Sequence, residues 1–200
     1  MPELLAQSGF EAPYLDFHAL APDIVLTGVI VLILLADLVV SETRKVLVTN
    51  LAGVGVLVSL VPIITLAVDG ADRSMFGGAY VVDNFALLMK AVFLIAGYVV
   101  LLMSTNYIDE GDYYEGEYSF LLLSSLLGMT IMASSRDLIT IFVALELLSI
   151  PAYMLAGWRK RDLNSNEAAL KYYLLGVLAS AVMLYGMSLV FGATGTTVLD

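Results

Sequence analysis

The feature of this sequence that most restricts its fold is a series of six long apolar stretches. They run approximately over residues 22–40, 46–68, 84–104, 118–134, 138–158 and 166–191. Crossing about 30 Å of hydrocarbon takes about 20 apolar residues in a helix, because lipid offers no partner for an unpaired backbone group. The sequence therefore predicts an all-α fold, a polytopic bundle of six transmembrane helices that forms a single membrane domain over residues 1–200.

The composition agrees with a membrane location and excludes several classes of function. Hydrophobic residues make up 60% of the chain and charged residues only 14%, whereas soluble domains carry about 25% charged residues. The net charge of −10 argues against nucleic-acid binding, which needs clustered Lys and Arg. The chain has no cysteine and one histidine, which excludes disulfides, iron–sulfur ligation and an ordinary haem or zinc site within it. We therefore expect no metal and no cofactor in this chain.

Basic residues between the apolar stretches predict the orientation, because cytoplasmic loops carry an excess of Lys and Arg. With the N-terminus outside, the cytoplasmic loops contain Arg44, Lys45, Arg159, Lys160 and Arg161. The outer loops then contain only Arg73 and Arg136. The distribution favours an external N-terminus. The first basic residue is Arg44, so we expect that the N-terminus is not a cleavable signal peptide, which needs a basic region of its own.

Glu146 is the clearest candidate for a functional charge inside the membrane. It lies several residues from either end of the 138–158 stretch, too deep for a short carboxylate to reach water. An ionisable group at that depth costs at least about 2.5–3.5 kcal/mol, so it is a functional-site hypothesis by default. The functional interpretation is a carboxylate that binds and releases protons. The alternative is a structural residue, either protonated and hydrogen-bonded to a neighbouring helix or held in an ion pair.

Pro151 supports the functional interpretation of Glu146. Proline cannot donate to the carbonyl of Leu147, so the helix should loosen there and admit water beside the acid. A simple packing kink is the alternative.

Two lysines are open to both interpretations. Lys171 lies about 9 Å into the sixth stretch at 1.5 Å per residue, so it could extend to the interface. It could also form a helix-surface pair with Glu167, four residues before it. Lys90 lies about two turns from the outer end of the third stretch and is equally ambiguous.

The remaining polar residues are predicted to lie at helix ends. Asp23 and Asp37 are expected at the interfaces, near the two ends of the first stretch, and His18 on the surface before it. Asp137 is placed to cap the fifth helix, and Asn164 with Glu167 has the form of a capping box at the start of the sixth.

From residue 137 onward the sequence resembles a known family. The segments that carry the likeness are 145–151 (LELLSIP), 157–161 (GWRKR) and 166–173 (NEAALKYY), supported by 179–187 and 192–197. They are similar to subunit N of bacterial NADH–quinone oxidoreductase, respiratory complex I. The separation between Glu146 and Lys171 matches the family pattern. The sister subunits L and M usually have Trp just before this Glu, and Leu145 therefore favours N.

The resemblance implies an antiporter-like subunit of the membrane arm of a hetero-oligomeric complex in the bacterial inner membrane, in contact with lipid and other membrane-arm subunits. Glu146 would couple with buried lysines and water to pass protons, with Lys171 in a secondary role, and Lys90 matches a position that often carries Lys. NADH, flavin, iron–sulfur clusters and quinone would belong to other subunits. Because the family subunit is more than twice as long, we expect an N-terminal portion, with the lysine partner of Glu146 beyond residue 200.

The leading hypothesis is thus a proton-translocating subunit that couples redox energy to pumping. Two alternatives stay open at this point. One is a subunit of a cation/proton antiporter, which sodium-dependent transport would distinguish. The other is a structural membrane scaffold, in which Glu146→Gln would change assembly but not pumping.

Overall fold

The computed structural model of the chain describes residues 15–39, 46–70, 72–110 and 115–199. Within them, six helices are long and apolar enough to cross a membrane, which confirms the predicted polytopic helix bundle. They are α2 (Phe17–Val39), α3 (Val46–Asp69), α4 (Asn84–Glu110), α5 (Glu115–Ser134), α6 (Leu138–Ala156) and α7 (Leu163–Thr194). The outside location of the N-terminus stays a prediction.

Of the helices that begin earlier than the apolar pattern predicts, α2 and α7 are capped by aspartates outside the apolar runs. The carboxylate of Asp16 accepts the backbone N–H groups of His18 and Ala19, so α2 starts five residues before the predicted stretch. His18 therefore lies in the first turn of α2, not before the helix. Asp162 caps α7 by accepting the N–H of Asn164. The capping box predicted at Asn164 is wrong, because Asp162 is an equally good cap two residues upstream.

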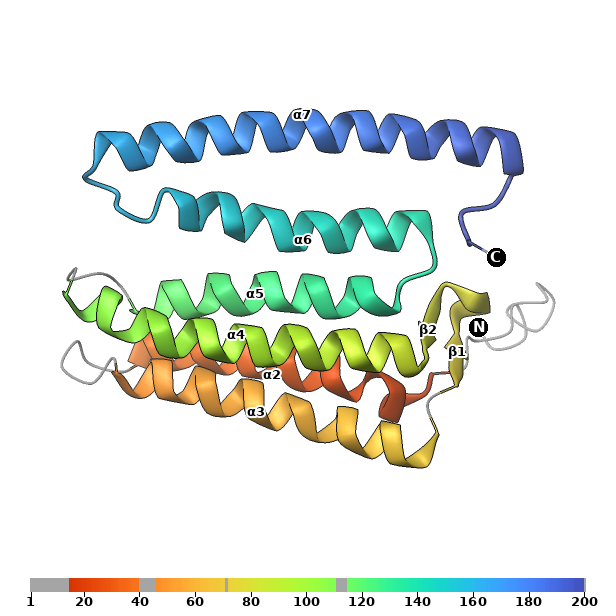
Figure 1. Cartoon of the computed structure of the whole chain (residues 1–200), viewed down its shortest axis with the longest axis horizontal. Coiled ribbons are helices and arrows are strands. Elements are labelled where there is room, and N and C mark those ends of the chain that lie inside the picture. Colours follow the sequence, from red (N-terminus) through yellow and green to blue (C-terminus); the bar gives the residue numbers. More distant parts are fainter. Residues whose placement is uncertain (1–14, 40–45, 71, 111–114, 200) are drawn as a thin grey trace, which may run out of the picture.

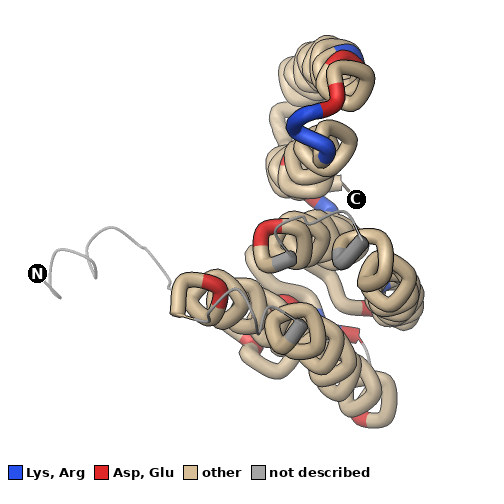
Figure 2. The backbone as a smooth tube through the Cα atoms, turned by 90° about the vertical axis from the view of Figure 1, so that its left-hand side faces the viewer, with Lys and Arg blue, Asp and Glu red and all other residues tan. Residues whose placement is uncertain are grey.

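The helices form a bundle with two further helices stacked on one side. Helices α2, α3, α4 and α5 pack on one another, α6 packs on α5, and α7 packs on α6 (Figures 1 and 2). Successive helices run in opposite directions, so α2, α4 and α6 all begin at the same end of the molecule (Figure 1). We call this the hairpin end, because the short β-hairpin lies there, and the opposite end the loop end.

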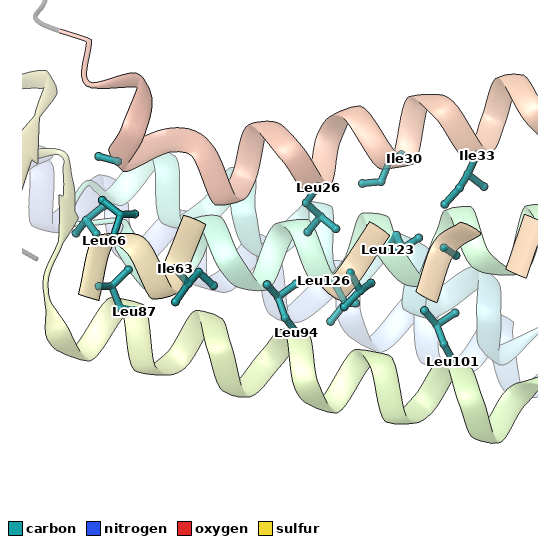
Figure 3. Packing of buried hydrophobic residues seen from close by; sticks show 14 of the residues in the cluster. Leu26, Ile30, Ile33, Ile63, Leu66, Leu87, Leu94, Leu101, Leu123 and Leu126 are labelled. Atoms are coloured by element: carbon teal, nitrogen blue, oxygen red, sulfur yellow. The ribbon is translucent and has the colours of Figure 1, made fainter. Parts of the chain in front are cut away.

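The core lies inside the α2–α5 bundle. Its fully buried side chains include Leu26, Ile33, Leu66, Leu94 and Leu123, which meet along the bundle axis (Figure 3). Apolar side chains also cover the outward faces of the helices, and α7 has no buried residue. In lipid this outward surface carries no penalty, because the surrounding tails are as apolar as leucine.

The hairpin is the one element of the described chain that the all-helical prediction lacks. Strands β1 (Arg73–Met75) and β2 (Tyr80–Val82) pair antiparallel, with Met75 opposite Tyr80. The turn between them, η2 (Phe76–Gly78), takes positive φ angles at all three of its residues, two of which are glycines. Tyr80 also bridges to Ser135 after α5. These pairings hold the hairpin against the bundle and bury Tyr80.

Candidate functional site

Glu146 lies at mid-height of α6. It is about 12 Å along the helix from Leu138 and about 15 Å from Ala156, at 1.5 Å per residue. Its side chain is half-buried, but its Oε1 atom is fully covered and accepts no hydrogen bond from the residues that the structure describes. Buried polar atoms normally have a partner. Oε1 of Glu146 is therefore a buried acceptor that can bind a proton or accept a hydrogen bond.

Helix α5 holds the turn of α6 that carries Glu146. At Gly128 an added Cβ would lie 2.6 Å from the backbone N of Leu148 and 2.7 Å from the carbonyl oxygen of Ala144. Only glycine permits so close an approach. One turn earlier, the hydroxyl of Ser125 donates to the carbonyl of Leu148 at 2.9 Å. The backbone around Glu146 is therefore fixed from both sides of its turn, and the sequence reasoning did not identify this seam.

Pro151 is buried within α6, and the helix continues through it to Ala156. The carbonyl of Leu147, which Pro151 cannot serve, lies next to the Leu148 carbonyl that Ser125 bonds. The loosening predicted at this turn and the entry of water beside Glu146 stay predictions.

Lys171 faces outward on α7. Its ammonium forms an i,i+4 ion pair with Glu167, and the two side chains are 70% and 62% exposed. This geometry is the surface pair that the sequence left as an alternative. Among the described residues no ion pair joins Lys171 to Glu146, so its role in proton transfer stays a proposal.

Lys90 is fully buried, which the sequence left undecided. Its Nζ lies 2.7 Å from Oδ2 of Asp23 and 2.7 Å from the hydroxyl of Tyr80, and that hydroxyl donates to the same Oδ2. Asp23 is 7% exposed. α2 begins at Phe17, so Asp23 lies nearly two turns inside the helix and is paired within the bundle. Its location at the membrane interface stays a prediction. We call these three residues the Asp23–Lys90–Tyr80 cluster.

Parallel helices bring the cluster together. Asp23 and Lys90 each lie about 9 Å from the start of their helices, and both helices begin at the hairpin end (Figure 1). The opposite charges therefore meet at one depth, and β2 adds Tyr80. Burial and the negative charge of Asp23 raise the pKa of Tyr80 well above its ordinary value, so the phenol stays a hydrogen-bond donor. No local pattern in the sequence indicates a contact between residues so far apart in the chain.

The loop end carries a different set of charges. Asp37, two residues before the end of α2, lines a cavity of about 430 Å³ together with Glu117 and Lys160. Lys160 pairs with Glu117 at 3.0 Å. Basic residues occupy the connection between α6 and α7 (Figure 2). Within the described ranges, no three His, Cys, Asp or Glu side chains lie close enough to hold a metal ion.

Comparison with known proteins gives matches over most of the chain. The family model described as NADH:quinone oxidoreductase/Mrp antiporter, TM, matches residues 135–200, which include α6, α7, Glu146 and Lys171. NADH-quinone oxidoreductase subunit N of Anoxybacillus flavithermus is 43% identical over 184 residues, which are 91% of this chain and 37% of that protein.

Solved structures agree on the fold. A chain of respiratory complex I from Thermus thermophilus has a TM-score of 0.75 and 31% identity, covering 90% of this chain and 38% of that one. A chain of an archaeal membrane-bound sulfane sulfur reductase has a TM-score of 0.78 over 92% of this chain and 39% of its own, and at 21% identity it supports the fold alone.

This chain spans about two-fifths of the length of the proteins it matches. Six membrane-spanning helices, the family model and the identity to complex I subunits agree. The chain is a multi-pass membrane protein and a homologue of NADH-quinone oxidoreductase subunit N.

Proposed function

We propose that this chain is part of a proton-translocating subunit in the membrane arm of an NADH–quinone oxidoreductase, and that Glu146 binds and releases a proton there. The observation that carries the proposal is the carboxylate at mid-height of α6, whose covered Oε1 has no donor in the described part of the chain. The choice of complex rests on the relatives, which are named NADH-quinone oxidoreductase subunit N.

The chemistry follows from the cost of a charge in hydrocarbon. A carboxylate there must be neutralised by a proton or paired with a cation. In the proposal, a lysine that approaches the carboxylate replaces its proton as the neutralising group, and a lysine that withdraws lets the proton return. In the proposal that lysine lies beyond residue 200. Lys171 and Lys90 act in secondary roles, and Pro151 loosens the turn for water.

The rest of the assembly belongs to the same proposal. Partner subunits of the membrane arm surround this one in a hetero-oligomer of the bacterial inner membrane. The electron carriers, namely NADH, flavin, iron–sulfur clusters and quinone, lie on other subunits. With the N-terminus outside, the hairpin end faces the outer water.

The deciding experiment uses the full-length subunit in its complex, reconstituted in sealed vesicles. Proton uptake and NADH oxidation are measured for the wild type, for Glu146→Gln and for Glu117→Gln as a control. Glu117 is half-exposed at the loop end. Both rates should fall together in Glu146→Gln and remain in Glu117→Gln. If Glu146→Gln pumps with the wild-type stoichiometry, the buried carboxylate is structural, as in the scaffold alternative.

A second candidate function comes from the matched family, whose description also covers Mrp antiporters. A stand-alone cation/proton antiporter would move protons in response to a sodium gradient in vesicles that contain no NADH. The proposed function expects no such movement.

A further inference from the structure

The cavity at the loop end lies between α2, α5 and the segment that leads from α6 to α7. Helices α2 and α6 both pack on α5, and α6 is stacked outward from the bundle (Figures 1 and 2). The cavity has a volume of about 430 Å³, and proteins bind organic molecules in cavities of about 300–1,000 Å³. It is therefore large enough to hold part of a ligand.

The inner walls of this cavity are apolar. They are formed by Leu34 of α2, Phe120 and Leu121 of α5 and Met154 of α6. Leu34 and Met154 are 47% and 56% exposed, so the described part of the chain does not cover them from outside. Leu121 lies about 9 Å from the start of α5 at 1.5 Å per residue, and the cavity extends to that depth. Walls of this kind fit a hydrocarbon chain.

Aromatic side chains indicate that the mouth of the cavity lies at the level of lipid headgroups. Trp158 packs edge-to-face on Tyr118 with ring centroids 5.5 Å apart, and Nζ of Lys160 lies 5.8 Å from the Trp158 ring. The indole N–H of Trp158 is covered and has no acceptor among the described residues. Trp and Tyr are enriched where hydrocarbon meets the headgroups, because each has an apolar ring and a polar tip. The cavity thus extends from the headgroup level towards the hydrocarbon.

Three charged side chains line the mouth, and their charges do not balance. Lys160 pairs with Glu117 at 3.0 Å. Asp37 forms no hydrogen bond or ion pair with any described residue. Its carboxylate lies against Gly116, where an added Cβ would be 2.0 Å from Oδ1, so the glycine leaves room for the acid. The lining has two carboxylates and one ammonium, and the group that would balance it is a cation.

We propose that this cavity binds one phospholipid whose headgroup carries both a primary ammonium and a phosphate, as in phosphatidylethanolamine. The ammonium pairs with Asp37, the phosphate lies towards Lys160, and an acyl chain lies along Phe120 and Leu121. An anionic phospholipid would add negative charge to a lining that already has an excess of it. A choline headgroup has the positive charge but no N–H to donate to the carboxylate. The site does not depend on the proposed role of Glu146.

The test is photocrosslinking on the complex that contains the full-length subunit, reconstituted in bilayers. The probe is a phosphatidylethanolamine that carries a diazirine on its acyl chain. Mass spectrometry should find the label on the lining residues Phe120, Leu121 or Met154. An excess of unlabelled phosphatidylethanolamine should remove this label, whereas equal amounts of phosphatidylcholine or phosphatidylglycerol should leave most of it.

Asp37→Asn should lower the labelling by about fivefold, because the headgroup then loses a partly exposed ion pair. Glu167→Gln is the matched control. Glu167 is an exposed acid in the first turns of α7, at the same end of the molecule but outside the cavity, and its variant should label like the wild type.

Leu34→Trp is a second variant that leaves every charge in place, in case Asp37→Asn does not assemble. The larger side chain fills the cavity from an exposed position, so the label on Phe120 and Leu121 should disappear. Equal competition by all three phospholipids would show ordinary boundary lipid only. A wild type without label on the lining residues would show that another part of the assembly covers the cavity. Either result overturns the proposal, and neither bears on pumping by Glu146, which the vesicle assay measures separately.

Discussion

At the residue scale, Lys90 shows how completely a charge inside the bundle depends on its partners. An ammonium with no exposed surface is held by one carboxylate and one phenol. Replacement of either Lys90 or Asp23 leaves the other as an uncompensated buried charge, whereas replacement of both leaves an apolar site. The single and double variants should therefore differ strongly.

Lys90→Met alone should lower the stability of the subunit by about 3–5 kcal/mol, because Asp23 is then buried without its cation. The double variant Asp23→Leu, Lys90→Met should recover most of that loss. Thermal unfolding of the isolated complex in detergent measures both. Lys171→Met is the control, because Lys171 and its partner Glu167 are 70% and 62% exposed and exposed pairs contribute about 0–1 kcal/mol. If the stability losses of Lys90→Met alone and Asp23→Leu alone add up to the loss of the double variant, the two residues are not coupled.

At the element scale, the placement of α6 depends on residues outside its own apolar run. Asp137 caps α6 as predicted, accepting the N–H of Thr140 at 2.9 Å. Gly128 lets α5 approach the backbone of α6. The cap fixes where α6 starts, and the glycine fixes how closely it packs, so together they place Glu146.

Asp137→Ala should cost about 1 kcal/mol at the start of α6. Burial raises the pKa of Asp137, but hydrogen bonds from Thr197, Thr140 and Ile139 outweigh it and hold the pKa below its ordinary value. A lowered carboxyl pKa stabilises the folded state above the unfolded value, about 3.9, and that stabilisation disappears as the pH falls through the folded value. Hydrogen exchange of the first turn of α6 should show the loss. Asp137→Asn, which still caps, should lack this acid dependence.

Gly128→Ala should separate α5 from α6, because its Cβ would meet backbone atoms that cannot move aside. Overpacking of this kind costs about 1–3 kcal/mol, and displacement of Glu146 should lower proton pumping as well. Gly186→Ala on α7 is the matched control, since its Cβ meets nothing within 4 Å. Replacement of Gly186 by alanine should stabilise α7 by about 0.5–1 kcal/mol. Equal behaviour of the two variants would contradict the close α5–α6 seam.

At the scale of the whole molecule, the chain is a packed bundle with two helices stacked outward from it (Figures 1 and 2). Polar chemistry is unevenly distributed along it. The buried cluster and the hairpin lie at one end, and the basic connection between α6 and α7 lies at the other. A difference in basic residues between the two ends is the feature that sets the orientation of a membrane protein.

The hairpin end should face the outer water, by the excess of basic residues at the loop end. The chain has no cysteine, so single cysteines can report its sides. In right-side-out vesicles, Asp72→Cys should react with a membrane-impermeant maleimide, whereas Asn164→Cys should react only after permeabilisation. Both side chains are exposed. The reverse labelling pattern would place the N-terminus inside.

Local and periodic information explains what sequence reasoning predicted correctly. The six spans follow from the length of the apolar runs, because lipid forces each one into a helix. The depth of Glu146 follows from its place in one run, and the Asp137 cap follows from the residue that precedes it. Errors at local scale arose where a cap lies outside the run, as at Asp16 and Asp162.

By itself, the sequence determined the membrane class of this protein, the number of its spans and the position of an acid within one of them. Tertiary structure alone decided that Asp23, Lys90 and Tyr80 meet, and that Gly128 lies against the turn of Glu146. The physical reason is that apolar runs act within one helix, where each residue must match the lipid around it. Ion pairs and close helix contacts instead depend on which helices become neighbours and at what height, and that is settled only when the bundle packs.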